Sequence, residues 1–395
     1  MRFLHVIANT DPRSGGPVQA VSTLSKALVD FGHEVEIASL EPEKVASKRG
    51  LAVRIIGLGH GLGRHSVNPK LTSWLKRNAQ NYDVVILHGL WNYASVGSWL
   101  ALRGHATPYF IFSHGMMAQW FRKSFPAKHI VKQIYWWLIQ GRVLRDAKAV
   151  LFTCDEERAD ARNVFLGHPY RECVIRYGTA EPQRDGERDK REFYAAFPEL
   201  QNKPFLLCLC RIHPIKGCDL LLKAFAHCGQ RLPADLNIMI AGPDQVGWML
   251  QLRALAQELG IPDRVHWPGM LNGALKWGAL CASDAMILPS HHENFGFVVA
   301  EAMAVSSPVL ISDKVNIWRE VEASGGGLVE LDTEEGTANL MCRFYALSTE
   351  ERARMAAAAH EGFRRYFDVS LAASDLTRAV GPQTRKFPEF EIGNG

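Results

Sequence analysis

Short apolar runs rich in β-branched residues alternate along the chain with longer amphipathic runs. Apolar runs of this length predict strands, and the amphipathic runs between them predict helices. Strands that alternate with helices are typical of an α/β fold, in which a parallel sheet carries helices on both faces. The predicted strands are 3–8, 34–40, 51–58, 83–88, 109–114, 149–154 and 173–178, followed by 204–212, 236–242, 264–269, 284–290, 307–312 and 326–331.

The alternation is interrupted at residues 179–193, which are charged and turn-rich and show no strand pattern. This interruption and the length of 395 residues predict two domains joined by an interdomain connection. We expect an N-terminal domain at 1–182 and a C-terminal domain at 183–364. A helix at about 365–385 is expected to pack back on the first domain, ahead of a tail at 386–395.

Both halves open alike, with a buried strand, a basic loop that contains glycine, and an apolar helix. The two openings are residues 3–16 and residues 205–218. This partial repeat favours two similar Rossmann-like units with a cleft between them.

Several protein classes are disfavoured by the sequence. The eight cysteines include no Cys-x-x-Cys pair and no zinc-type spacing, which indicates neither a disulfide framework nor a structural metal. The N-terminus lacks the features of a signal peptide. Residues 84–102 have the length of a membrane span and no acidic or basic residue, but polar His88 and Asn92 favour a strand, a turn and a helix of a soluble core. A cytoplasmic protein is therefore expected.

Charge is distributed unevenly along the chain, although the net charge is only +4. Residues 1–180 contain 23 Lys and Arg against 13 Asp and Glu, whereas the remainder contains 22 against 28. A basic first half indicates an anionic partner, which is a nucleic acid, an acidic lipid surface or a phosphorylated acceptor. Composition does not choose among these three.

Candidate chemistry follows the predicted strands, because ligands of open α/β sheets bind beyond the carboxyl ends of the strands. Arg211 directly follows the apolar run at 206–210, and Lys216 precedes Gly217, where the backbone turns into a helix. Two cations on one such loop are suited to neutralise a diphosphate without a metal. The alternative is an ordinary solvated surface loop.

The stretch at 289–304 carries two glutamates. Glu293 lies in a loop, Gly296 allows close approach of a ligand to the backbone, and Glu301 falls about one turn into an apolar helix. The helix N-terminus suits a phosphate, and the deeper carboxylate suits a vicinal diol such as a ribose. A structural salt bridge of Glu301 is the alternative.

His114 follows the apolar run at 109–112 and precedes Gly115. This position places an imidazole at the carboxyl end of the N-terminal sheet. Either a structural hydrogen bond or a catalytic role fits that position.

Taken in order, these motifs resemble glycosyltransferase family 4 over nearly the whole chain. The similarity lies in Ser-Gly-Gly after the first strand, Ser-His-Gly-Met, Arg-Ile-His-Pro-Ile-Lys-Gly, and two glutamates with seven residues between them. It implies the GT-B architecture of two facing Rossmann-like domains with a cleft, and a retaining glycosyltransferase like those of bacterial polysaccharide and cell-surface glycan synthesis. The implied partners are a nucleotide-diphosphate sugar and a glycan or lipid-linked glycan acceptor, with no nucleic acid and no metal or other cofactor.

The resemblance also implies roles for particular residues. Arg211 and Lys216 hold the donor diphosphate, Glu301 holds the ribose, and His114 contacts the transferred sugar. The implied catalytic residues are His114, Glu293, Arg211 and Lys216. The implied donor-binding residues are Gly15, Gly16, Arg211, Lys216, Glu293, Asn294, Phe295, Gly296, Phe297, Val298 and Glu301. The chain departs from the family pattern at Tyr177, where Asn is common, and at Ser306, where Gly is common.

Two further stretches have competing interpretations. Residues 57–63 are rich in glycine but contain no Gly-x-Gly-x-x-Gly in any frame, so a dinucleotide site is not expected there. Residues 119–148 contain seven Lys and Arg, one acid and several aromatic residues. They suit either adsorption to an anionic membrane, on the inner face of the plasma membrane, or a core helix whose Trp and Ile face inward. The membrane candidates are Arg122, Lys123, Lys128, Lys132, Trp136 and Trp137.

Two other functions compete with glycosyl transfer. A nucleotide-sugar epimerase of the same fold is one, although the Arg211 and Lys216 loop and the paired glutamates argue against it. The other is a non-catalytic protein that binds nucleic acid or an anionic surface through the basic half. That function leaves Glu293, Glu301 and His114 without a role.

Overall fold

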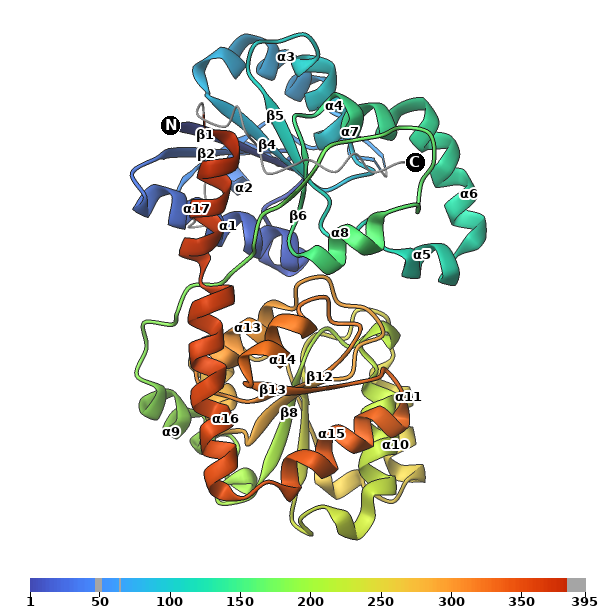
Figure 1. Cartoon of the computed structure of the whole chain (residues 1–395), viewed down its shortest axis with the longest axis vertical. Coiled ribbons are helices and arrows are strands. Elements are labelled where there is room, and N and C mark those ends of the chain that lie inside the picture. The colour runs from blue at the N-terminus through green and yellow to red at the C-terminus, as the bar shows by residue number, and fades with distance from the viewer. Residues whose placement is uncertain (47–51, 64, 382–395) are drawn as a thin grey trace. The chain divides into compact units, whose positions relative to one another are not determined.

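The computed structural model describes residues 1–46, 52–63 and 65–381, which form two compact units (Figure 1). The first unit comprises Met1–Ala180 together with the chain from Val369 onward, and the second comprises Glu181–Asp368. The boundary between the units lies two residues before the predicted one, and the second unit ends four residues after its predicted end. The predicted tail at 386–395 falls outside the described residues.

The first unit contains a seven-stranded parallel sheet in the order β3-β2-β1-β4-β5-β6-β7. Every strand predicted in this half is present. The central residues of β1, β4, β5 and β6 are buried on both faces, which explains why these strands appear in the sequence as continuous apolar runs. The strands are β1 (Arg2–Ile7), β2 (Glu34–Ser39), β3 (Arg54–Gly57), β4 (Val84–His88), β5 (Tyr109–Phe112), β6 (Val150–Phe152) and β7 (Glu172–Val174).

Helices connect these strands in the first unit. Asn68 and Asn92 cap the helices that follow them, accepting hydrogen bonds from the amides of Lys70 and Ser95. The segment 84–102 is β4 followed by α4, as predicted, and no helix among the described residues is long and apolar enough to cross a membrane. The helices are α1 (Gly16–Asp30), α2 (Glu43–Ala46), α3 (Pro69–Asn78), α4 (Tyr93–Leu102), α5 (Gln119–Ser124), α6 (Pro126–Tyr135), α7 (Gly141–Asp146) and α8 (Asp155–Ala161).

Helix α17 (Val369–Val380) belongs to the first unit although it comes last in the chain. It packs on α1, and Thr377 Oγ1 lies 3.2 Å from His33 Nε2. Arg176 donates two hydrogen bonds to the Asp375 carboxylate, at 2.6 and 2.8 Å. The chain therefore returns to its first unit through a helix, at the place where the sequence predicts one.

The second unit contains a six-stranded parallel sheet in the order β10-β9-β8-β11-β12-β13. The six predicted strands are again present: β8 (Phe205–Leu209), β9 (Asn237–Ala241), β10 (Val265–Gly269), β11 (Ala285–Leu288), β12 (Val309–Ser312) and β13 (Gly327–Glu330). The helices are α9 (Gly186–Ala196), α10 (Cys218–Cys228), α11 (Met249–Glu258), α12 (Gly273–Ala282), α13 (Phe297–Ala304), α14 (Trp318–Ser324), α15 (Glu334–Ala346) and α16 (Thr349–Gly362).

The prediction of an interdomain connection at 179–193 is wrong for most of that stretch. Helix α9 begins at Gly186, and the Asp185 side chain caps it. Phe193 is fully buried, and a Cβ on Gly278 of α12 would lie 2.2 Å from the backbone oxygen of Asp189. The helix thus packs closely on α12 through few apolar residues, and its many charges conceal it in the sequence.

Both sheets have the strand order of a doubly wound Rossmann-like fold. In each unit the chain builds strands outward on one side, returns to the first strand, and continues on the other side. The order reverses between β1 and β4 in the first unit and between β8 and β11 in the second. Ligands of such sheets bind beyond the carboxyl ends of the strands at this reversal, so the loops after β8 and β11 are expected to form a ligand site in the second unit.

Candidate functional site

The loop after β8 is held tightly against the loop after β11. After a short helical turn at Pro214–Lys216, Gly217 adopts a left-handed conformation with φ of 65°. A Cβ at this position would lie 2.1 Å from the carbonyl oxygen of Pro289, so the close packing also requires glycine. The Ile215 carbonyl accepts a hydrogen bond from the His291 amide at 2.8 Å. The two loops are therefore fixed as one structure.

Lys216 and Glu293 form an ion pair between these two loops. The Lys216 side chain is buried, and its ammonium contacts the Glu293 carboxylate. Burial by itself would raise the pKa of Glu293, but the charge and hydrogen bond of Lys216 hold that pKa below its usual value. The structure thus brings together a cation and an anion that lie 77 residues apart in sequence.

Arg211 lies on the same loop but is exposed. Its Nη1 donates to Gln245 Oε1 at 3.0 Å, a contact at the protein surface. The guanidinium therefore remains accessible to a diphosphate, in contrast to the buried ammonium of Lys216.

The N-terminus of α13 follows directly after Glu293. Gly296 caps it in a left-handed conformation with φ of 72°, and a Cβ there would lie 3.2 Å from Glu293 Cγ. Phe295 is buried against Phe297 and Phe367 and anchors the loop. Since its ring belongs to the core, only the Phe295 backbone can face a ligand. Asn294 and Val298, the other implied donor-binding residues of this segment, flank the same turn.

Glu301 is buried in α13 and forms a salt bridge. Its Oε1 lies 2.6 Å from Lys276 Nζ of α12. Sequence reasoning offered a structural salt bridge as the alternative to ribose binding but did not identify Lys276. The pair does not exclude a diol, because a carboxylate accepts several hydrogen bonds. Ribose binding by Glu301 stays a prediction.

In the first unit, Gly15 caps α1 at the end of the loop that follows β1, and Gly16 is the first residue of α1. Gly15 has φ of 88° and ψ of −151°, a conformation open essentially to glycine, and a Cβ there would meet nothing within 4 Å. The conformation, rather than crowding, therefore requires glycine at Gly15. Upstream, Thr10 donates to the buried Glu41 carboxylate from its amide and its hydroxyl, both at 2.6 Å. This loop lies at the reversal point of the first sheet.

His114 belongs to a chain of three imidazoles. His5 Nδ1 lies 2.8 Å from His88 Nε2, and His88 Nδ1 lies 3.1 Å from His114 Nε2. Tyr177 Oη lies 3.4 Å from His114 Nδ1, so the departure at Tyr177 from the family pattern contacts the implied sugar-binding histidine. His114 itself has φ of 51°, which is unusual for a residue with a side chain. The chain of imidazoles fixes the orientation of the His114 ring.

Burial keeps these histidines neutral. Desolvation lowers the pKa of His5 and of His114 to about 3, and it also lowers the pKa of His88 well below the ordinary value. At neutral pH, His114 therefore offers one N–H donor and one acceptor rather than a charge. His88 and Tyr177 contact the two ring nitrogens of His114, so a sugar hydroxyl that bonds to this imidazole has to replace the longer contact, that with Tyr177.

The depressed pKa values predict acid sensitivity. The unfolded chain protonates His5 and His114 near pH 6.5 and the folded chain only near pH 3, so the unfolded state binds more protons between those values. Stability should fall as pH drops from 6.5 toward 3. We expect His88→Gln to reduce the loss of Tm between pH 7.5 and pH 5, and exposed His60→Gln to leave it unchanged. An unaltered loss in His88→Gln would contradict the assignment.

The basic, aromatic stretch at 119–148 divides into two parts. Trp136 is buried and stacks on Phe165, so its prediction as a membrane contact is wrong. The alternative of an inward-facing core helix is wrong for α5 and α6, where every residue is at least partly exposed. The exposed apolar residues are Phe121, Phe125, Ile130, Val131, Ile134, Trp137 and Leu138.

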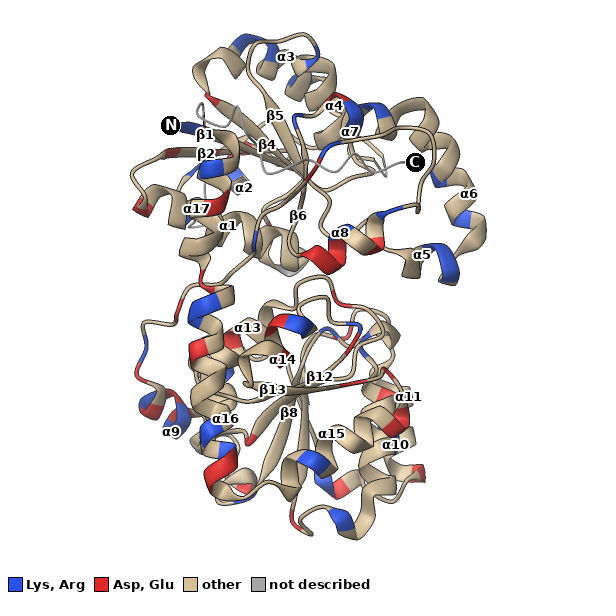
Figure 2. Ribbon diagram, viewed as in Figure 1, with Lys and Arg blue, Asp and Glu red and all other residues tan. Residues whose placement is uncertain are grey.

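Cations surround these apolar side chains. Figure 2 shows Lys and Arg on both α5 and α6. Lys128 Nζ lies 4.6 Å from the centre of the Phe125 ring, and Lys132 Nζ lies 4.7 Å from that of Trp91. Arg122 donates to the Asn163 carbonyl at 3.1 Å, and Lys123 is exposed. We call the exposed residues of 121–138 the basic apolar surface.

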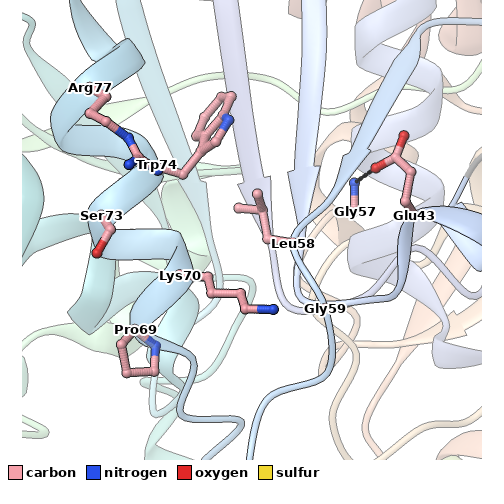
Figure 3. Close-up of a pocket in the computed structure, with 9 residues that line it drawn as sticks. All are labelled: Glu43, Gly57, Leu58, Gly59, Pro69, Lys70, Ser73, Trp74 and Arg77. Carbon is pink, nitrogen blue, oxygen red and sulfur yellow. Dashed lines mark hydrogen bonds between the residues drawn. The ribbon is translucent and has the colours of Figure 1, made fainter.

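A pocket of about 680 Å³ lies elsewhere in the first unit, between the end of β3 and α3 (Figure 3). Lys70, Trp74 and Arg77 line it, and the Gly57 amide donates to Glu43 at 2.7 Å on its other side. Gly57 and Gly59 come from the glycine-rich stretch noted above. The two cations suit an anionic ligand, and none of the implied donor-binding residues contributes to the lining.

Family models match both units of the chain. Residues 15–178 match the glycosyl transferase 4-like domain, and residues 189–362 match glycosyl transferases group 1. Together these matches span most of the described residues, and the chain belongs to glycosyltransferase family 4. The predicted family and fold class are confirmed.

Relatives and solved structures agree with this family. A D-inositol 3-phosphate glycosyltransferase of Xylanimonas cellulosilytica is 27% identical, with 95% of this chain and 93% of the relative covered. A sucrose-phosphate synthase structure from Thermosynechococcus elongatus has a TM-score of 0.76 at 19% identity, covering 95% of this chain and 97% of its own. Anabaena HepE in complex with UDP and glucose has a TM-score of 0.74 at 18% identity, with coverage of 96% and 99%.

Proposed function

We propose that the protein is a retaining glycosyltransferase that moves a sugar from a nucleotide-diphosphate sugar to a glycan or lipid-linked glycan acceptor without a metal. The observation that carries the proposal is the ion pair of Lys216 with Glu293 at the reversal point of the second sheet, beside exposed Arg211. Family membership favours this function over an epimerase or a non-catalytic binding protein. The solved relative that contains UDP and glucose agrees with such a donor.

The proposed reaction depends on stabilising the negative charge that develops on the departing diphosphate. As the bond between the anomeric carbon and the donor phosphate breaks, negative charge grows on the departing diphosphate, and Arg211 and Lys216 stabilise it. The N-terminus of α13 adds its dipole and amides. An acceptor hydroxyl attacks the anomeric carbon from the same face and passes its proton to the departing phosphate oxygen. Configuration is thereby retained without a protein nucleophile, and neutral His114 orients the sugar by hydrogen bonding.

A panel of radiolabelled nucleotide sugars tests the function. We expect one donor to be hydrolysed slowly without acceptor, in the presence of EDTA, and the released sugar to keep its anomeric configuration. An epimerised nucleotide sugar would favour the epimerase. Absence of turnover with every donor and acceptor, or inversion of configuration, would overturn the proposal.

The acceptor side of the proposal rests on the basic apolar surface. Ile130, Val131 and Ile134 are 50–68% exposed on one helix and lie among Lys128, Lys132 and the cations of α5. Apolar side chains framed by cations complement the headgroups and acyl boundary of an anionic bilayer. We therefore propose that the first unit docks on an anionic membrane, where a lipid-linked acceptor is found.

Vesicle sedimentation measures this docking. With about 1 kcal/mol per basic residue near such a surface, the protein should sediment with anionic vesicles at low salt and be released by salt. Replacing Arg122, Lys123, Lys128 and Lys132 by Ser should abolish binding. Exchanging four exposed cations of the second unit, Lys203, Arg231, Arg364 and Arg365, should preserve it. Absent binding at low salt, or equal loss in both variants, would contradict docking by this surface.

A further inference from the structure

Three cysteines of the second unit lie together. Cys208 lies on β8, Cys210 follows that strand, and Cys218 is the first residue of α10. The Sγ atom of Cys210 lies 3.8 Å from that of Cys208 and 3.8 Å from that of Cys218, and all three lie within 4.8 Å of one another. Zinc-type spacing rules overlook this group, because its members come from a strand and from the start of the next helix.

The backbone dictates this proximity. Residues two apart on an extended chain point to the same side, which places the side chains of Cys208 and Cys210 together. The Cys210 amide donates to the Ala241 carbonyl at 2.9 Å, continuing the pairing of β8 with β9. A Cβ on Gly242 would lie 1.7 Å from the Cys210 carbonyl oxygen, so neighbouring backbone encloses this position. The left-handed turn at Gly217 then places Cys218, the first residue of α10, beside Cys210.

The sulfur spacing matches a metal centre. Bonds of about 2.3 Å from a metal to thiolates place the sulfurs about 3.8 Å apart in a tetrahedral site and about 4.0 Å apart in a trigonal one. Cys208 and Cys218 are buried, whereas Cys210 is partly exposed and offers an entry route. Two of the three sulfur separations therefore already match a metal centre before any ion arrives.

We propose that Cys208, Cys210 and Cys218 bind one soft, thiophilic cation, with Cu(I) in trigonal coordination as the ion that fits. Thiolates select soft ions, whereas structural zinc normally takes four protein ligands, and among the described residues this group supplies three. A second close pair, Cys228 and Cys342, has its sulfurs 3.5 Å apart but offers only two ligands in the described structure. It serves as an internal comparison.

Anaerobic titration of the full chain with Cu(I), in competition with bicinchoninate, tests the site. We expect one tightly held ion, with X-ray absorption showing three sulfurs at about 2.3 Å. Cys210→Ser and Cys218→Ser should each weaken the apparent affinity at least tenfold. Cys342→Ser and Cys281→Ser, which alter cysteines outside the group, should leave that affinity unchanged.

The sulfur count from X-ray absorption and the affinities of the cysteine variants can each overturn the proposal. Two sulfurs instead of three would overturn coordination by all three cysteines, and loss of the tight ion in Cys342→Ser with retention in Cys210→Ser would place the metal at the other pair. Equal affinity in all four variants would show adventitious binding. Circular dichroism melting of each metal-free variant confirms folding, and the sulfur count on the unaltered chain does not depend on any variant. Zn²⁺ titrated alone should bind at least tenfold more weakly than Cu(I). Equal or tighter Zn²⁺ binding would overturn the proposed preference of the site for Cu(I) in trigonal coordination.

Discussion

Replacing Lys216 by alanine is expected to lower glycosyl transfer at least tenfold, and it is the most damaging single change that we predict. In the proposed mechanism the ammonium stabilises the departing diphosphate, and losing one such cation costs about 2 to 4 kcal/mol of barrier. The same change leaves the Glu293 carboxylate without its ion pair. We therefore expect a lower Tm as well, with kcat/KM measured in EDTA as the primary readout.

A double variant separates catalysis from folding at Lys216. Lys216→Ala combined with Glu293→Gln removes both charges, so it should regain much of the lost Tm without regaining activity. Lys223→Ala, at a partly exposed position of α10 outside the site, should change neither quantity. Recovery of activity in the double variant would show that Lys216 acts only through structure.

Arg211→Ala is expected to lower activity without lowering Tm. The guanidinium is exposed and contacts only the Gln245 side chain among the interactions described for it, so Tm should stay within about 1 °C of the unaltered chain. Activity should still fall at least tenfold because the diphosphate loses a cation. Full activity in Arg211→Ala, or an absolute need for Mg²⁺, would contradict the diphosphate assignment.

The sheets were the most predictable part of the fold. Strands such as β4 and β11 are buried on both faces, so an unbroken apolar run is sufficient to identify them. Helix α9 was missed because Phe193 is its one fully buried apolar side chain, and Asp185 caps a segment of mixed charge. Contacts with α12, rather than its own sequence pattern, stabilise that helix.

The candidate site residues were predictable from the sequence, but the side chains that they contact were not. Position after a strand identified Lys216 and Glu293, whereas the ion pair between them depends on how two loops pack. His5 lies inside an apolar run, where nothing local distinguishes it from a core residue, yet it ends the chain that reaches His114. Periodicity also cannot separate a membrane-facing helix from a core helix. Trp136 and Trp137 are adjacent, but one is buried and the other is exposed.

The salt bridge between Glu301 and Lys276 gives the ribose hypothesis a direct test. Glu301→Gln keeps the shape of the side chain and removes its charge, so a carboxylate that binds a ribose diol predicts weaker nucleotide binding by about tenfold, or 1.4 kcal/mol. Calorimetry should show this loss with the nucleoside diphosphate of the identified donor. The 2′,3′-dideoxy analogue, which lacks the diol, should bind both proteins alike.

Lys276→Met is the matched change on the other side of the bridge. It leaves the buried Glu301 carboxylate without this partner, and breaking such pairs costs about 3 to 5 kcal/mol, so Tm should fall sharply. Glu301→Gln should lower Tm far less, because the Lys276 side chain is 23% exposed and can reach water. A large fall in Tm for Glu301→Gln with unchanged nucleotide affinity would make Glu301 a structural residue. The second unit would then have to bind its ribose through other groups.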